Sequence, residues 1–283
     1  SMTNFNIPLV GNSPFINQLK KQLSKISQAN SRLLISGPIG SGKKLISQII
    51  HAKSQFSKSL CVLIDFKNTS DDELNDLLSS TNININRNIL TLSNNNTLIL
   101  ENIDSLNLEY QKKLLFFLEN IHFFNENKIN LNQKIISLTT QNIKDLINNG
   151  NFIQALYDRL STTMIHAPPI SLRRGDILPI FEYYIDYYNR NKKYNFSFSK
   201  NAKAKMELYD WPGNISQIIN YAEKTIILNQ DSNINCDFII DNLPMDMGEY
   251  QNNYNKENNY ELSLKQARQN FEKDYLLSQI KRF

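Results

Sequence analysis

The segment from residue 37 to residue 43 reads GPIGSGK, which is the spacing of a loop that binds phosphate groups. Glycines let such a backbone curl until its N–H groups converge on phosphate oxygens, and the following helix adds its positive end. Lys43 is placed to reach the outer phosphates of a nucleotide. An apolar strand, Leu33 to Ser36, precedes the loop and an apolar helix follows it. We therefore predict a nucleotide site; the alternative is a glycine-rich turn with a chance lysine.

The residue after the loop lysine departs from the general motif. That position normally carries Ser or Thr, whose hydroxyl contacts magnesium, but here it is Lys44. A second ammonium at this place either points to solvent or repels the metal. We predict ATP or ADP as the ligand, with magnesium as an optional companion. The predicted cradle consists of consecutive residues of the loop and the helix start: Gly37, Pro38, Ile39, Gly40, Ser41, Gly42, Lys43 and Lys44.

Strand and helix patterns alternate around this loop. Apolar runs predict strands over Leu33–Ser36, Leu60–Asp65, Thr97–Glu101, Ile135–Thr139 and Thr163–His166. Helical spacing predicts helices over Ile16–Gln28, Lys43–Ala52, Asp71–Ser79 and Leu108–Ile121. After Pro168 and Pro169 only helical patterns follow: Asp176–Asn191, Ser199–Tyr209, Asn214–Leu228 and Cys236–Leu243. The order predicts an α/β fold, with a parallel sheet covered on both faces, followed by a small all-helical domain.

Composition sets further bounds. The chain has 283 residues, 41% of them hydrophobic, which is enough for more than one domain. No signal peptide or membrane span is expected from the apolar runs. Cys61 and Cys236 lack metal-ligand spacing, so we predict buried thiols in a cytoplasmic protein. The net charge of +4 permits a nucleic-acid partner without requiring one.

The chain divides into four predicted parts: an α/β nucleotide-binding part over 1–168, a helical lid over 169–245, a polar linker over 246–261 and a helix over 262–283. The linker is polar and without periodicity, which is typical of a flexible segment. The last helix has an apolar face with no partner in the chain. This face suggests either a fragment of a longer protein or a helix that forms a dimer.

From about Leu9 to Leu243 the chain resembles a known family, the central AAA+ domain of sigma-54-dependent activators of the NtrC and NtrX type. The resemblance begins at LVGNSPFINQL and continues through the phosphate loop, NNNTLILENIDSLNLEYQKKLLFFLE and GNFIQALYDRLSTTMIHAPPISLRRGDI. It ends in YDWPGNISQIINYAEKTI, where Trp211-Pro212-Gly213-Asn214 is the most specific part. The tail LKQARQNFEKDYLLSQI resembles the approach to the family's C-terminal helix-turn-helix.

This resemblance implies a five-stranded AAA+ P-loop core with a small helical lid, and it places Val10 and Gly11 near the adenine. It also implies ATP hydrolysis in a ring of subunits that remodels sigma-54 RNA polymerase. A receiver domain, addressed by a sensor kinase, would precede the segment, and a DNA-binding domain would follow it. The implied partners are therefore further copies of the chain, as an oligomer or dimer, and DNA, without a membrane.

The departures from the family fall on the residues that would perform hydrolysis. The family has Asp-Glu after the third strand, whereas this chain has Glu101-Asn102. Glu101 is the candidate for holding magnesium, and Asn102 takes the water-orienting position although an amide is not a base. Asp104, two residues further on, is an alternative acid. In the family's phosphate-sensing position the chain has Thr140, unless a shift of register supplies Asn142.

Further departures concern the arginines and the remodelling loop. Of two family arginines that act on the neighbouring subunit, the first aligns with Ile153, and only Arg159 is retained, as a catalytic residue or a structural ion pair. In the lid, Ser216 replaces an arginine, and at the position of Lys44 the family often has an acidic residue in place of Ser or Thr. Between Leu78 and Asn96 the family's Gly-Ala-Phe-Thr-Gly-Ala segment is missing, and the alternation of Asn82 to Asn86 suits an edge strand or hairpin.

Three hypotheses follow. The favoured one is a nucleotide-binding AAA+ module of an NtrX-like regulator with weak or no hydrolysis, because each lost charge-stabilising group costs about one hundred- to one thousand-fold in rate. The second is an active ATPase with rearranged residues that remodels sigma-54 polymerase. The third is a scaffold that no longer binds nucleotide.

Overall fold

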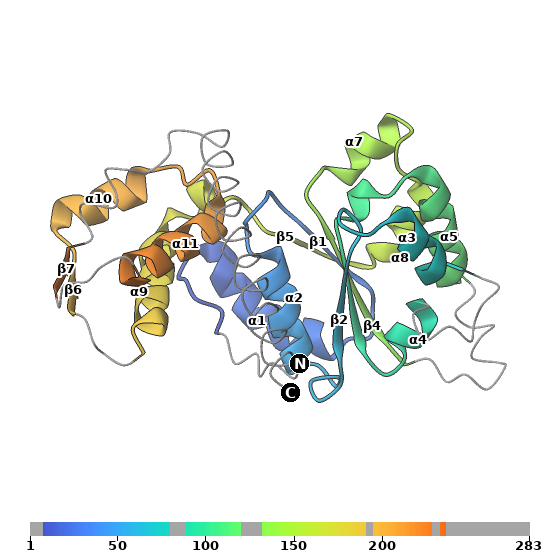
Figure 1. Cartoon of the computed structure of the whole chain (residues 1–283), viewed down its shortest axis with the longest axis horizontal. Helices are drawn as coiled ribbons and strands as arrows, with labels where there is room; N and C mark the ends of the chain where they lie inside the picture. Colours follow the sequence, from blue (N-terminus) through green and yellow to red (C-terminus); the bar gives the residue numbers. More distant parts are fainter. Residues whose placement is uncertain (1–7, 80–88, 120–131, 191–194, 228–232, 236–283) are drawn as a thin grey trace, which may run out of the picture.

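Five short apolar strands form the central sheet of the computed structural model, which describes residues 8–79, 89–119, 132–190, 195–227 and 233–235. The strands are all parallel and lie in the order β2-β3-β4-β1-β5. Parallel strands need crossover connections, which the intervening helices provide on both faces (Figure 1). The strands are β1 (Leu33–Ser36), β2 (Cys61–Asp65), β3 (Thr97–Glu101), β4 (Lys134–Thr139) and β5 (Thr163–His166).

Two apolar clusters cover the two faces of this sheet. Successive side chains of a strand point to opposite faces, so Leu33 and Ile35 pack with one layer and Leu34 with the other. The first layer contains α1 (Pro14–Gln28) and α2 (Lys43–Lys53). The second layer contains α3 (Asp71–Leu77), α4 (Ile89–Ser93), α5 (Leu108–Glu119), α7 (Ile143–Asn148) and α8 (Gln154–Leu160).

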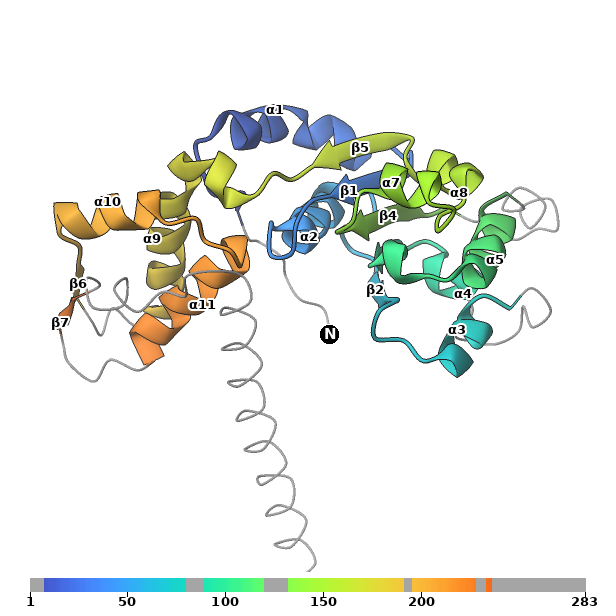
Figure 2. The same cartoon turned by 90° about the horizontal axis from the view of Figure 1, so that it is seen from above.

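A smaller lid lies beside the first layer, at the left of Figures 1 and 2. Its core is built around Trp211, of which 1% is exposed and whose indole N–H donates to the carbonyl of Met206. It begins with two short 3-10 turns, η2 (Ile170–Leu172) and η3 (Arg174–Asp176). The other elements of the lid are α9 (Ile177–Tyr188), β6 (Asn195–Ser197), α10 (Lys200–Leu208), α11 (Asn214–Ile227) and β7 (Asn233–Asn235).

The structure confirms the predicted α/β class and all five predicted strands, with shifts of one residue at β2 and β4. The lid is not entirely helical, because β6 and β7 form a two-stranded parallel sheet. These strands are three residues long and polar at alternate positions, too short for a pattern to reveal. The sequence also gave no sign of α4, α7 and α8, which are five to seven residues long.

Several expectations lie outside the described residues. These are the helix over Cys236–Leu243, the linker over 246–261, the helix over 262–283 and the strand over Asn82–Asn86. Within the described part of the chain, Cys61 is a free, half-buried thiol, and burial raises its pKa to about 11. None of the helices described there has the length and apolarity that crossing a membrane requires.

Candidate nucleotide-binding site

The glycine-rich loop joins β1 to α2 and adopts backbone angles that suit glycine alone. Gly40 and Gly42 have φ angles of +73° and +94°, in the left-handed region. A Cβ at Gly40 would lie 2.2 Å from the carbonyl oxygen of Gly213 in the lid, and one at Gly37 would lie 2.3 Å from that of Ala167. The loop is therefore held between core and lid with no room for a side chain at either position.

Lys43 turns back onto its own loop. Its Nζ donates to the carbonyl oxygens of Gly37, at 2.6 Å, and Pro38, at 2.9 Å. Burial lowers the pKa of Lys43 to about 8, although the nearby carboxylates of Asp104 and Glu101 act in the opposite direction. A phosphate group near the loop would offer the ammonium a charged partner in place of two neutral carbonyls.

The lid contacts the loop directly through the start of α11. The Asn214 side chain donates to the Ile39 carbonyl, at 2.8 Å, and accepts from the Ile170 N–H, also at 2.8 Å. The Ser216 N–H donates to the Gly40 carbonyl, at 3.2 Å. Asn214 has a φ of +54°, which asparagine tolerates better than most residues. The Trp-Pro-Gly-Asn motif thus brings an amide from the lid onto the phosphate loop.

A buried polar network ties the N-terminal segment and the loop to the lid hinge. Asp176 is fully buried and accepts hydrogen bonds from the N–H groups of Asn12 and Ser13 and from the Ser13 hydroxyl, at 2.6–2.7 Å. Arg173 lies 3.9 Å from the Asp176 carboxylate and donates to the Ser41 carbonyl, at 2.7 Å. Burial lowers the pKa of Arg173 to about 10, and the Asp176 charge opposes that shift.

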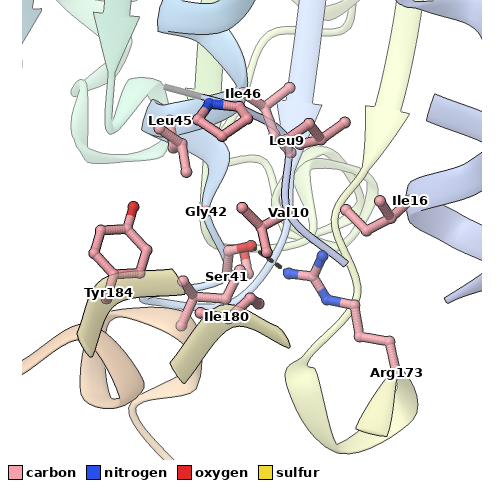
Figure 3. A pocket seen from close by; sticks show the side chains of 12 residues that line it. Leu9, Val10, Ile16, Ser41, Gly42, Leu45, Ile46, Arg173, Ile180 and Tyr184 are labelled. Carbon is pink, nitrogen blue, oxygen red and sulfur yellow. Dashed lines mark hydrogen bonds between the residues drawn. The ribbon is translucent and has the colours of Figure 1, made fainter. Parts of the chain in front are cut away.

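An apolar pocket lies between the loop, the N-terminal segment and α9 (Figure 3). Two buried polar atoms of its lining residues have no hydrogen-bond partner among the described residues: Ser41 Oγ, in the phosphate loop, and Arg173 Nε. Apolar surroundings beside a phosphate loop suit a nucleotide base. The pocket is lined by Pro8, Leu9, Val10, Ile16, Ser41, Gly42, Leu45, Ile46, Arg173, Ile180, Tyr184 and Ile215.

Val10 and Gly11, predicted together, have different surroundings. Val10 lines the pocket, whereas Gly11 packs against the hinge network. A Cβ at Gly11, whose φ is +130°, would lie 2.4 Å from Asp176 Oδ1. Gly11 thus lets the Asp176 carboxylate approach the backbone, and its place beside an adenine stays a prediction.

On the other side of the loop, Glu101 and Lys44 face each other. Lys44 Nζ lies 3.4 Å from Glu101 Oε2, with half of the lysine and a quarter of the glutamate side chain exposed. The described residues contain no group of three His, Cys, Asp or Glu side chains arranged to hold a metal ion. The predicted magnesium contact of Glu101 stays a prediction, since here the carboxylate has an ammonium partner.

The Asn102 side chain is hydrogen-bonded to an acid at the end of the neighbouring strand. Its Nδ2 donates to Asp65 Oδ1, at 2.6 Å, and its φ of +57° lies in the left-handed region. Burial acts to raise the pKa of Asp65, but hydrogen bonds from Asn102, Asn68 and the Lys67 N–H, together with the charge of Lys44, lower it overall. The amide thus serves as a donor to a carboxylate.

In the loop after β4, Thr140 is predicted to take the position of the family's sensing asparagine. Thr140 lines a second hollow beside the phosphate loop. Asn142 does not replace it, because its side chain accepts from the Lys144 N–H and caps α7. Asp104 Oδ2 accepts from the Gln141 N–H, at 3.1 Å, while its buried Oδ1 lacks a partner in the described part of the chain.

Arg159 lies at the opposite edge of the sheet from the phosphate loop. Its carbonyl accepts from Arg32, which directly precedes β1, whereas the loop directly follows β1. Its guanidinium is 3.7 Å from the Glu119 carboxylate, and about half of each side chain is exposed. Arg159 therefore cannot reach the loop of its own chain. Ile153, predicted to take the position of the other family arginine, packs on the apolar core.

The sequence did not predict three of the residues that contact the phosphate loop or its hinge. Asn214 belonged to a recognised motif, which was a usable signal for a lid residue near the loop. Arg173 was predicted only as a structural residue of the hinge between core and lid, and Asp176 gave no signal. Their contacts with Ser41 and Ser13 span more than a hundred residues of chain.

The fold and the site together define a P-loop protein of the AAA+ class, in which a parallel five-stranded core carries a helical lid against the loop. The chain belongs to the sigma-54 interaction domain family, whose sequence profile matches residues 10–170. The profile of an AAA+ ATPase lid domain matches residues 171–259. The family resemblance seen in the sequence is thereby confirmed.

Individual relatives are similar to this chain over nearly its whole length. A putative response regulator described as NtrX-like from Rickettsia bellii is 30% identical over 292 residues, 97% of this chain and 61% of that protein. The nitrogen assimilation regulatory protein NtrX of Azorhizobium caulinodans is 31% identical over 290 residues, 97% of this chain and 63% of that protein. The chain thus spans less than two thirds of these curated relatives.

Two solved structures of NtrX from Brucella abortus share the fold at 26% identity. The complex with ATP has a TM-score of 0.71 and is matched over 85% of this chain and 57% of that one. The complex with ADP has a TM-score of 0.70 over 85% of this chain and 55% of that one. The likeness extends through both the core and the lid.

Proposed function

We propose that this chain is the nucleotide-binding AAA+ module of an NtrX-like transcriptional regulator, and that it binds ATP or ADP but hydrolyses ATP weakly or not at all. The observation that carries the proposal is the glycine loop with half-buried Lys43, which lies next to a pocket whose apolar lining suits a base. The core would extend to residue 168 and the lid from 169 to 245.

Support for binding comes from groups that the departures from the family leave intact. The loop amides and Lys43 depend on backbone shape and on one ammonium. The lid is held on the loop by Asn214 and by the Ser216 N–H. Ser41 Oγ is a buried polar atom without a partner in the described chain, which a ligand would satisfy. Similar proteins from Brucella abortus were solved with ATP and with ADP.

The case against efficient hydrolysis rests on the side chains that lie beside the phosphate loop, after β3 and β4. Asn102 donates to Asp65 and has no basic atom to accept a proton from water. Glu101 pairs with Lys44, and Thr140 takes the place of a sensing asparagine. Each lost group is worth about 10²- to 10³-fold in rate, and although such losses do not add simply, several together leave little turnover.

The wider assignments come from the relatives. We propose a cytoplasmic two-component regulator in which a receiver domain, addressed by a sensor kinase, precedes this segment and a DNA-binding domain follows it. The module would assemble as a dimer or larger oligomer through copies of itself. Without the remodelling segment between Leu78 and Asn96, it would not remodel sigma-54 polymerase as other activators do.

One observation favours a second candidate, a scaffold without a ligand. The Lys43 ammonium already donates hydrogen bonds to the carbonyls of Gly37 and Pro38, so the loop has a partner for its lysine without a ligand. Binding then requires the ammonium to leave two hydrogen bonds. We prefer nucleotide binding, because those bonds are to neutral groups and a phosphate offers a stronger, charge-assisted partner.

Calorimetric titration with ATP and ADP, followed by measurement of phosphate release, tests the proposal. The expected result is saturable binding by the wild-type protein, lost or strongly weakened in Lys43→Ala, with phosphate release no faster than in that variant. Absence of binding would favour the scaffold. Phosphate release above the Lys43→Ala level would favour the active ATPase.

A further inference from the structure

Lys44 stands where the general phosphate-loop motif presents a hydroxyl to magnesium, a position at which the family often has an acidic residue. It is the second residue of α2 and directly follows Lys43. Its ammonium extends towards the end of β3, where Glu101 Oε2 lies 3.4 Å away. The glutamate is the residue from which a metal ligand would be expected. One cation of the chain therefore already faces the acid that a divalent cation would use.

The second nearby acid is engaged as well. Asp65 accepts hydrogen bonds from Asn102 at Oδ1 and from Asn68 at Oδ2, and the charge of Lys44 contributes to its low pKa. Glu101 and Asp65 thus have partners that need no metal. Asp104, which also lies near Lys43, accepts from the Gln141 N–H through Oδ2, and only its buried Oδ1 has no partner among the described residues. In the described residues no set of three metal-ligating side chains is assembled.

Magnesium does not fit the groups present at this edge. An ammonium repels a divalent cation, cannot act as a ligand, and stands in place of the side-chain oxygen that the general motif or the family has at this position. Lys43 and Lys44 together carry two positive charges, the same charge that a magnesium ion brings to a polyphosphate. An exposed ion pair such as Lys44–Glu101 is weak, so the Lys44 ammonium is free to swing to a phosphate oxygen while remaining near the carboxylate.

We propose that Lys44 takes the place of the divalent cation, so that this site binds metal-free ATP or ADP and gains nothing from magnesium. The inference rests on the proposed nucleotide binding and specifies that the nucleotide binds without a magnesium ion. It also gives Glu101 a role as the carboxylate that positions the Lys44 ammonium between strand and loop.

The test measures the affinity of fluorescently labelled ADP and ATP in buffer with magnesium and in buffer with EDTA. For the wild-type protein we expect affinities that differ by less than about threefold between the two buffers. In Lys44→Thr, which restores a hydroxyl, we expect the affinity in EDTA to fall about tenfold or more, because a charge-assisted contact is lost, and magnesium to restore part of it.

Two further variants act as controls. Lys44→Arg keeps a positive charge and should keep binding independent of the metal. Lys112→Thr makes the same substitution at an exposed lysine of α5 and should leave both affinities at the wild-type level. Lys44 is half exposed, so its variants are expected to melt at nearly the wild-type temperature, which a thermal scan checks.

Each outcome separates the two proposals. Wild-type affinity that rises tenfold or more on adding magnesium overturns the inference and supports the predicted metal contact of Glu101, while nucleotide binding stands. Lys44→Thr that binds in EDTA as tightly as the wild-type protein also overturns it. If no nucleotide binds in either buffer, the proposed function itself fails, and this inference fails with it.

Discussion

The two sides of the phosphate loop are built in different ways. On the inner side, towards the lid, the loop is held by main-chain carbonyls, glycines without room for a Cβ, and the buried groups of Asn214, Arg173 and Asp176. On the outer side, towards β3 and β4, the groups that would act on phosphate are partly exposed side chains paired with each other, such as Lys44 with Glu101.

This difference teaches which function can persist when side chains change. Binding depends on backbone shape, and any substitution that disturbs it also disturbs the packing of core on lid. Hydrolysis depends on a few polar side chains at an edge, where substitution costs the fold almost nothing. A chain can therefore lose its water-orienting acid and keep its phosphate cradle. The predictions below contrast the two sides, from the largest expected effect to the smallest.

Removal of the hinge carboxylate should have the largest effect. Asp176→Ala leaves buried Arg173 without its acid and three donors of the N-terminal segment without an acceptor. We expect the free energy of unfolding to fall by about 3–5 kcal/mol, measured by chemical denaturation. The control is Asp210→Ala, which removes the exposed partner of Arg174 and should cost about 1 kcal/mol or less. Equal losses of stability in both variants would contradict a stabilising role for the buried network around Asp176.

Alanine substitutions at two glycines with nearly the same φ angle distinguish the cost of backbone strain from the cost of overpacking. Gly40 and Gly150 have φ angles of +73° and +72°, but only at Gly40 would a Cβ meet other atoms, 2.2 Å from the Gly213 carbonyl. Gly150→Ala should cost about 1–2 kcal/mol of stability for its backbone angle. Gly40→Ala should cost about 1–3 kcal/mol more, because the added methyl overpacks the contact between loop and lid. Denaturant titrations of both variants that coincide would argue against that contact.

The pH dependence of nucleotide affinity tests whether Lys43 contacts the phosphates. Its pKa of about 8 in the free protein means that the ammonium is lost as pH rises through that value, whereas a bound phosphate would hold the proton. Affinity should therefore fall above about pH 8, by up to about tenfold per pH unit. The free protein should show the opposite trend in stability, gaining as pH rises from about 8 towards 10.5, where the unfolded chain binds more protons.

Lys43→Arg is the matched control for this profile, since arginine stays charged at every pH of the titration. Its affinity should be nearly flat with pH, whatever its absolute level. A wild-type profile that is equally flat would mean that the loop lysine does not contact the phosphates.

The smallest effect is expected at Arg159. Its ion pair with Glu119 is about half exposed, so Arg159→Ala should lower stability by about 1 kcal/mol or less. Nucleotide affinity should stay unchanged in the same variant, because Arg159 lies at the far edge of the sheet from its own loop. A large loss of affinity that depends on protein concentration would instead assign Arg159 to the site of a neighbouring copy.

The parts of the candidate site that could be predicted from the sequence are those that are local in the chain. The loop, its strand and its helix are contiguous, so Gly37 to Lys43 could be assigned from spacing alone, and the family resemblance added the lid. What could not be predicted depends on contacts between distant segments. The Lys44–Glu101 pair joins residues 57 apart, and the Asn214–Ile39 bond joins residues 175 apart. Asn142, considered as a sensor, turned out to cap a helix too short to be predicted.

The central claim is that the inner side of the loop holds ATP while the outer side leaves it intact. A single-turnover experiment tests it most directly: excess protein is mixed with ATP labelled at the γ-phosphate, and bound nucleotide and free phosphate are followed in the same sample. We predict that the label stays with the protein as ATP and that phosphate appears no faster than with Lys43→Ala. Release of the bound label as phosphate, or failure of the protein to retain ATP, would contradict the account.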